Sequence, residues 1–171
     1  MDKPDGPDGL DELAGPIVIR RGRREDAATL AALHRDAAWC YDDANIVAEY
    51  YDDSFEPETV LAAEAGGALI GKLELFLGWK STSGHFGVIR RFVIHPDWRG
   101  RGVGQHLLAA AETQAREAGC AFLELSVDEG NPGARRLYAR DGFAEDRREI
   151  ILRKPLDGRA HPSQTDARLP D

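Results

Sequence analysis

The chain of 171 residues contains little cysteine and methionine, with two residues of the first and one of the second. Cys40 and Cys120 are too few for a disulfide scaffold, and we interpret them as thiols in a reducing compartment. No apolar run approaches the ~20 residues that a membrane-spanning helix requires. The opening MDKPDGPDGLDELAGP also lacks the basic-then-apolar order of a signal peptide. These absences predict a cytoplasmic protein.

Concentrated basic charge is missing as well, and the formal net charge is −8. Residues 1–16 hold five acidic residues and one lysine, and residues 155–171 hold three aspartates and two arginines. Both segments are rich in Pro, Gly and Asp without apolar periodicity, which predicts disordered tails. Residues 17–154 then carry only −3, and their length suits one domain. Neither nucleic acid nor a membrane is an expected partner of this mildly acidic domain.

Strand-like and helix-like patterns alternate between the two tails. The predicted strands cover residues 17–22, 59–67, 68–79, 85–94, 120–127 and 148–154, with a hairpin turn at Gly66-Gly67. The predicted helices cover residues 24–39, 45–53, 105–118 and 131–142. The helix over 105–118 connects two strands, so Phe86–Val127 forms a strand–helix–strand crossover. The element order therefore predicts an α/β or α+β domain.

Glycines gather where the strand over 85–94 passes into the helix that follows. Gly100, Gly102 and Gly104 lie in the stretch RGRGVG. At such a junction the unpaired backbone N–H groups and the positive end of the helix dipole converge. Without Cβ atoms, an anion could approach several N–H groups at once, and Arg99 and Arg101 add positive charge. The alternative is a tight turn with solvated arginines.

Two well-known phosphate loops do not match these letters. A nucleoside-triphosphate loop needs Gly-Lys-Ser/Thr, but Gly104 is followed by Gln105-His106. A dinucleotide-binding Gly-x-Gly-x-x-Gly beginning at Gly100 would need a glycine at position 105. The pattern that remains is Arg-x-x-Gly-x-Gly, formed by Arg99, Gly102 and Gly104.

This loop, after the strand RRFVIHPDW, resembles the coenzyme-binding loop of the GNAT superfamily of acyl-CoA-dependent N-acyltransferases. A second element, Asn-x-x-Ala-x-x-Leu-Tyr-x-x-x-Gly-Phe, follows at the spacing of that family, from Asn131 to Phe143. The resemblance is sharp over residues 86–143 and agrees in element order over 17–154. It implies a single GNAT-like N-acetyltransferase domain over 17–154, with a mixed, mostly antiparallel sheet of about six or seven strands and about four helices.

The resemblance also implies acetyl-CoA as cosubstrate, with no metal. The residues it assigns to the coenzyme are the backbone near the strand end, the glycine loop and the start of the later helix: Phe92, Val93, Ile94, Arg99, Gly100, Arg101, Gly102, Val103, Gly104, Gln105, Asn131 and Ala134. The strand is expected to diverge from the next one near Phe92 to admit the pantetheine arm, and its amides are expected to stabilise the developing oxyanion. Asn131 also fits a helix N-cap.

Tyr138 corresponds to the general acid of the family. A phenol with a pKa of about 10 is protonated at neutral pH and can donate to a leaving thiolate. The alternative is core packing, because Ala134, Leu137 and Tyr138 share one helical face.

The general base is harder to assign, because Phe86–Ile94 contains no carboxylate where many family members have a glutamate. The substitutes are Glu74 on the preceding strand, a water chain, or His85. We rank Glu74 first, although its alternation with Leu73 and Leu75 equally fits a solvent-facing residue. His95 is interpreted as a strand-end residue.

The expected reaction is acetyl transfer to a primary amine of a small molecule or peptide. Aromatic and acidic residues between positions 39 and 53 would suit a cationic amine, or form an exposed acidic surface, whereas Arg90 and Arg91 would favour an acceptor with a carboxylate. The missing carboxylate leaves a non-catalytic acyl-CoA-binding module as an alternative, and a protein N-terminal or lysine acetyltransferase as another. A homodimer is left open.

Overall fold

A five-stranded sheet organises the computed structural model, which describes residues 15–36, 56, 59–82, 84–150, 152 and 154. The strands in order across the sheet are β1 (Val18–Arg21), β2 (Val60–Ala65), β3 (Ala68–Lys80), β4 (Gly84–Ile94) and β5 (Leu123–Leu125). The first four pair antiparallel, and β5 pairs parallel to β4. This mixed, mostly antiparallel sheet confirms the predicted fold class, with fewer strands than expected in the described residues.

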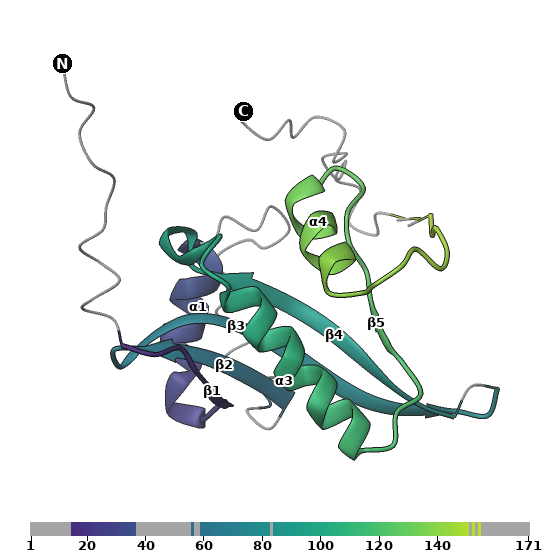
Figure 1. Ribbon diagram of the computed structural model, residues 1–171, viewed down its shortest axis with the longest axis horizontal. Coiled ribbons are helices and arrows are strands. Elements are labelled where there is room, and N and C mark those ends of the chain that lie inside the picture. The colour runs from purple at the N-terminus through teal and green to yellow at the C-terminus, as the bar shows by residue number, and fades with distance from the viewer. Residues whose placement is uncertain are drawn as a thin grey trace.

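Helices cover both faces of this sheet (Figure 1). The described helices are α1 (Ala27–Asp36), α3 (Val103–Glu117) and α4 (Pro132–Arg140). Two short 3₁₀ turns, η1 (Arg24–Asp26) and η3 (Pro96–Trp98), precede α1 and α3. Figure 1 shows α1 behind the sheet, α3 in front of it, and α4 above the C-terminal half of β4 in this view. The predicted helix over 45–53, the acidic tail of 1–14 and the tail of 155–171 lie outside the described residues.

Alternation along β2 gives the sheet two apolar faces. Leu61 and Ala63 pack with Leu107 and Leu108 of α3, whereas Val60 and Ala62 pack with α1. The predicted hairpin turn is confirmed, because Gly66 and Gly67 both have positive φ. Glycine adopts this conformation without the steric penalty that other residues meet. The two apolar faces of β2 thus leave the middle of the sheet buried on both sides.

The predicted amphipathic helix over 105–118 is confirmed as α3, and its apolar stripe is buried. Leu107, Leu108, Ala111 and Ala115 are at most 3% exposed. Gly119 has φ +72° immediately after the last helical turn, which is the conformation that ends a helix at glycine. The crossover from β4 through α3 to β5 therefore forms as the sequence indicates.

The predicted strand over 148–154 is not found in the described part of that segment. Ile150 and Leu152 are 87% and 88% exposed, so neither contributes to an apolar face. Arg148 instead bonds to Glu145 at 2.7 Å, in a local ion pair that needs no sheet partner. The predicted strand over 120–127 is also shorter, because only Leu123–Leu125 pair with β4.

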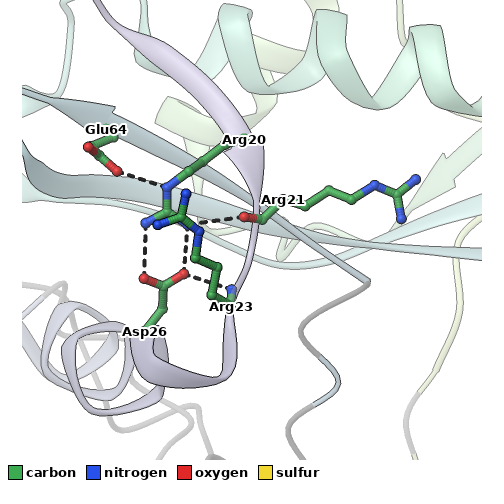
Figure 2. A network of polar contacts seen from close by, with 5 residues as sticks. All are labelled: Arg20, Arg21, Arg23, Asp26 and Glu64. Carbon is green, nitrogen blue, oxygen red and sulfur yellow. Dashed lines mark hydrogen bonds and ion pairs between the residues drawn. The ribbon is translucent and has the colours of Figure 1, made fainter.

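An ion-pair network ties β1 to β2 and to the last residue of η1 (Figure 2). Arg20 donates two hydrogen bonds to the Asp26 carboxylate, at 2.7 and 2.9 Å, and a third to Glu64 at 2.8 Å. Asp26 also accepts the backbone N–H of Arg23 at 2.8 Å. The hydrogen bonds from Arg20 hold the pKa of Asp26 below its ordinary value. The network fixes where the chain leaves β1 and turns into α1.

Replacing Asp26 with asparagine is expected to lower the free energy of unfolding at pH 7 by about 1–3 kcal/mol, because charge-assisted hydrogen bonds are lost. The carboxyl pKa is lower in the folded than in the unfolded chain, so this stabilisation is present above the ordinary pKa of 3.8 and fades as pH falls through the folded-state value. Urea denaturation should therefore show the free energies of unfolding of the wild type and of Asp26→Asn converging as the pH is lowered. The exposed Glu149→Gln is the control, and a pH-independent difference for Asp26→Asn would contradict the ion-pair explanation.

Candidate active site

The edge strand β5 separates from β4 about halfway along β4. Gly87, Val88 and Ile89 pair with Leu123, Glu124 and Leu125 of β5. Beyond Ile89, β4 continues to Ile94 and pairs only with β3 among the described strands. Figure 1 shows β5 running away from β4 toward α4. The predicted divergence before the glycine loop is therefore present.

Two backbone amides of β4 face this opening. His95 N donates to Ile70 O of β3 at 2.9 Å. Because successive N–H groups of a strand point to opposite sides, the Val93 amide also points to β3, while those of Phe92 and Ile94 point away from it. The Ile94 carbonyl agrees, because it accepts Arg99 Nε at 3.4 Å instead of a β3 donor. Of the three predicted strand residues, Phe92 and Ile94 thus present N–H groups to the opening.

The glycine loop lies between η3 and α3. Gly100 and Gly102 have φ of +78° and +83°, and Gly102 is the N-cap of α3 without a capping side chain. The first N–H groups of α3 therefore have no acceptor within the helix. Arg101 lies over the Trp98 ring, with 5.4 Å from its Cζ to the ring centroid. Val103 is buried and Gln105 exposed, so the predicted loop residues do not all face one side.

Gly104 differs in its surroundings from the other two glycines of the loop, Gly100 and Gly102. A Cβ built on it would lie 2.9 Å from Leu137 Cδ2 and 3.1 Å from Ile94 Cδ1. Gly104 is buried, so its missing side chain allows α4 and β4 to pack closely against the first turn of α3. The expectation that this position is bare for an anion to approach needs correction, because the space it leaves is filled by apolar side chains.

The start of α4 is capped as the sequence predicts. Asn131 Oδ1 accepts the backbone N–H of Ala134 at 3.0 Å, and Pro132 occupies the first helical position. Gly142 follows the helix with φ +90°. The N-cap interpretation of Asn131 is confirmed, and its contact with a coenzyme stays a prediction.

Tyr138 of α4 lies against the end of β4. Its ring centroid is 6.1 Å from that of Phe92 and 5.9 Å from that of Phe143. Burial raises the pKa of Tyr138 to about 12. The phenol is therefore fully protonated at neutral pH and stands beside the strand whose amides face the opening. Both the packing and the acid interpretations fit this position, because a ring in the core can still carry a hydroxyl toward the site.

Glu74 is fully buried, so the solvent-facing interpretation is wrong. Its Oε1 accepts a hydrogen bond from Lys72 Nζ at 2.6 Å, and its Oε2 accepts one from Arg91 Nη1 at 2.9 Å. Both carboxylate oxygens are thus bound to cations, an arrangement that does not favour proton abstraction from an amine. His85 is paired with Trp79 at the opposite end of β4, on the order of 30 Å along the strand from Ile94.

The residues expected to line the acceptor site fall into two groups. Those between positions 39 and 53 lie outside the described residues. Arg90 is exposed, with its Cζ 5.1 Å from the centroid of the Phe76 ring. Arg91 is bound to Glu74 and has φ +42°, the one positive φ among the described non-glycine residues. Sequence reasoning missed this conformation, because an arginine carries no sign of it.

The described residues contain no group of three or more His, Cys, Asp or Glu side chains arranged to hold a metal ion. Within the same residues, no helix is long and apolar enough to cross a membrane.

The family model for the "Acetyltransferase (GNAT) family" matches residues 28–143. An aminoglycoside N(6′)-acetyltransferase type 1 of Stenotrophomonas maltophilia is 31% identical over 152 residues, covering 85% of this chain and 97% of the relative. The chain therefore belongs to the GNAT family and is an acyl-CoA-dependent N-acyltransferase of the acetyltransferase type.

Two solved structures share the fold at low sequence identity. An aminoglycoside N-acetyltransferase in complex with CoA gives a TM-score of 0.69 at 20% identity, covering 81% of this chain and 95% of the other. A ribosomal-protein-alanine N-acetyltransferase of Brucella melitensis biovar Abortus gives 0.71 at 21% identity, covering 81% and 100%. These acceptors differ widely in chemistry, so the shared fold does not define the substrate.

Proposed function

We propose that this protein transfers the acetyl group of acetyl-CoA to a primary amine of a small molecule or peptide. The observation that carries the proposal is the parting of β4 from β5 beside the glycine loop, with the Phe92 and Ile94 amides facing the opening. The structurally similar aminoglycoside N-acetyltransferase was solved in complex with CoA, which supports the same cosubstrate here.

The residues at the opening suit the two ends of this cosubstrate. The positive end of α3 and the backbone N–H groups after Gly102 favour a pyrophosphate, and Arg99 and Arg101 add charge beside it. The Ile94 N–H can pair with an amide group of the pantetheine arm as a neighbouring strand would, which leaves the Phe92 N–H for the thioester. The Asn131 side chain is assigned to the coenzyme on the family motif alone.

Acetyl-CoA supplies an activated acetyl thioester to this site. The amine forms the C–N bond as the C–S bond breaks, and the thiolate takes its proton from the Tyr138 hydroxyl. The Phe92 N–H can donate to the thioester oxygen as negative charge develops there. The nitrogen loses its surplus protons to water, because Glu74 is bound by two cations, and one of these protons returns through water to the Tyr138 phenolate.

The test is an acceptor panel with purified protein and acetyl-CoA, monitored by the release of coenzyme A thiol. Polyamines, aminoglycosides, amino acids and peptides form its four arms. At least one arm is expected to release thiol in proportion to enzyme and acceptor, with the acetylated product seen by mass spectrometry.

Calorimetric titration with acetyl-CoA accompanies the panel as a control. Binding without turnover of any acceptor would favour the acyl-CoA-binding module instead. Turnover of peptides alone would make the protein a protein N-terminal or lysine acetyltransferase.

A further inference from the structure

We propose that Glu74 is a positioning residue that acts through Arg91: their ion pair holds a bulge in β4 that directs Phe92 toward the active site. The inference rests on the proposed function, because the site it shapes is the one assigned to acetyl-CoA. It also replaces the role of general base that the sequence suggested for Glu74.

The bulge is visible in the register of β3 and β4. Glu74 pairs with Arg90, but Lys72 pairs with Val93. Leu73 alone therefore lies opposite two residues, Arg91 and Phe92. One extra residue of this kind is a β-bulge, which reverses the alternation of the strand beyond it.

This reversal decides which residues face the site. Before the bulge, Ile89 packs on the α3 side of the sheet. Regular alternation would place residues 91 and 93 on that side, but Phe92 and Ile94 pack there and Val93 packs on the α1 side. Without the bulge, the Phe92 ring would leave Tyr138. The backbone N–H of Phe92 would then point to β3, as the N–H groups of Arg90 and Val93 do.

The conformation at the bulge is one that arginine does not favour. Arg91 has φ +42°, in the left-handed region that is unfavourable for any residue with a Cβ. A local structure of this kind persists only where its surroundings enforce it. The enforcing contact here is the Arg91–Glu74 bond of 2.9 Å.

Glu74 itself has no freedom to move away from this contact. Its side chain and that of Lys72 are completely buried, and the two are joined at 2.6 Å. The Arg91 side chain is 38% exposed. The network thus has a rigid, buried end on β3 and a partly exposed end on β4, which is the geometry of an anchor for the bulge.

The first experiment compares Arg91→Ala, Arg91→Gly and Arg91→Lys, which all keep the buried Lys72–Glu74 pair. Glycine tolerates positive φ, whereas alanine does not. Arg91→Ala is expected to lower kcat by about 10- to 100-fold, because small displacements of aligned groups are costly in catalysis. Arg91→Gly is expected to stay within about tenfold of the wild type.

Arg21→Gly on β1 serves as the control for placing glycine in an exposed strand position, and should leave kcat unchanged. If Arg91→Gly and Arg91→Ala lose equal activity while Arg91→Lys restores it, Arg91 acts by its charge on a ligand and the proposal is overturned. Thermal melting identifies any variant that is unfolded at the assay temperature.

A double-mutant cycle then tests Glu74. If Glu74 acts through Arg91, Glu74→Gln should reduce kcat in the wild type but have little further effect in the Arg91→Gly protein. Equal losses in both backgrounds would show that Glu74 acts on its own, as a base would. Should the wild type turn over none of the acceptors, the same cycle is measured as acetyl-CoA affinity by calorimetry, so failure of the proposed function is separate from failure of this inference.

Discussion

Replacing Tyr138 with phenylalanine is expected to lower kcat by roughly ten- to a thousand-fold while acetyl-CoA affinity changes little. The substitution keeps the ring contacts with Phe92 and Phe143 and removes only the proton donor. Because burial raises the pKa of Tyr138 to about 12, the acid stays protonated across the usual assay range. Loss of its function with rising pH should appear only as the pH approaches that value, so a fall of kcat near neutral pH belongs to another group.

Tyr138→Ala is the matched comparison for the packing role. It removes the ring as well as the hydroxyl and should lower stability through a cavity, by about 3–5 kcal/mol if the site behaves as a core aromatic. Rates with the best acceptor and melting temperatures should be measured for both variants. A phenylalanine variant with wild-type turnover, under conditions where chemistry limits the rate, would remove Tyr138 from the mechanism.

Gly102→Val is expected to weaken acetyl-CoA binding by at least about tenfold, because a branched side chain obstructs the anion site and disfavours the φ of +83° found there. A Cβ at Gly102 would make only ordinary van der Waals contacts, the nearest at 3.8 Å to His106, so overpacking is not the cause. Calorimetry with acetyl-CoA measures the effect.

Gly119→Val is the matched control, because Gly119 also has a positive φ, +72°, with no atom near its would-be Cβ. It lies beyond the opposite end of α3, about 25 Å from Gly102 along the helix axis. The strain of the two substitutions is alike, and only the Gly102 variant should lose affinity. Equal effects of both would show that backbone strain alone weakens binding.

Gly104→Val provides a contrast within the same loop. Its side chain would meet Leu137 and Ile94, so overpacking should reduce the free energy of unfolding by about 1–3 kcal/mol. Urea denaturation separates this loss of stability from any loss of affinity. A Gly104→Val protein with wild-type stability would contradict the packing role of this glycine.

The sequence predicts well those elements whose signals are local. Helical periodicity predicts the apolar stripe of α3, and capping residues within a few positions predict the N-cap at Asn131. Glycine pairs, which tolerate positive φ, predict the hairpin turn. The order of these elements gives the crossover. Gly102 and Gly104 of the same motif nevertheless have different surroundings. Only the tertiary contact of Leu137 with the first turn of α3 distinguishes Gly104 from Gly102.

The bulge of β4 could not be predicted in this way. It consists of an arginine in a conformation typical of glycine, held by a glutamate from the neighbouring strand. The alternation of Glu74 with Leu73 and Leu75 fits a solvent-facing residue. That interpretation is wrong because β3 is covered on both faces, so neither face of the strand is exposed to solvent at Glu74. The strand predicted over 148–154 is likewise not found in the described residues of that segment, since β-propensity needs a pairing partner to take effect.

A crystal structure of the protein with acetyl-CoA tests the central claim most directly. The pyrophosphate is expected at the N–H groups of the loop from Arg99 to Gly104. The pantetheine arm should lie between the diverging ends of β4 and β5, hydrogen-bonded to the Ile94 backbone, with the sulfur near the Tyr138 hydroxyl. A coenzyme bound elsewhere, or a thioester out of reach of both Phe92 and Tyr138, would contradict the proposed site.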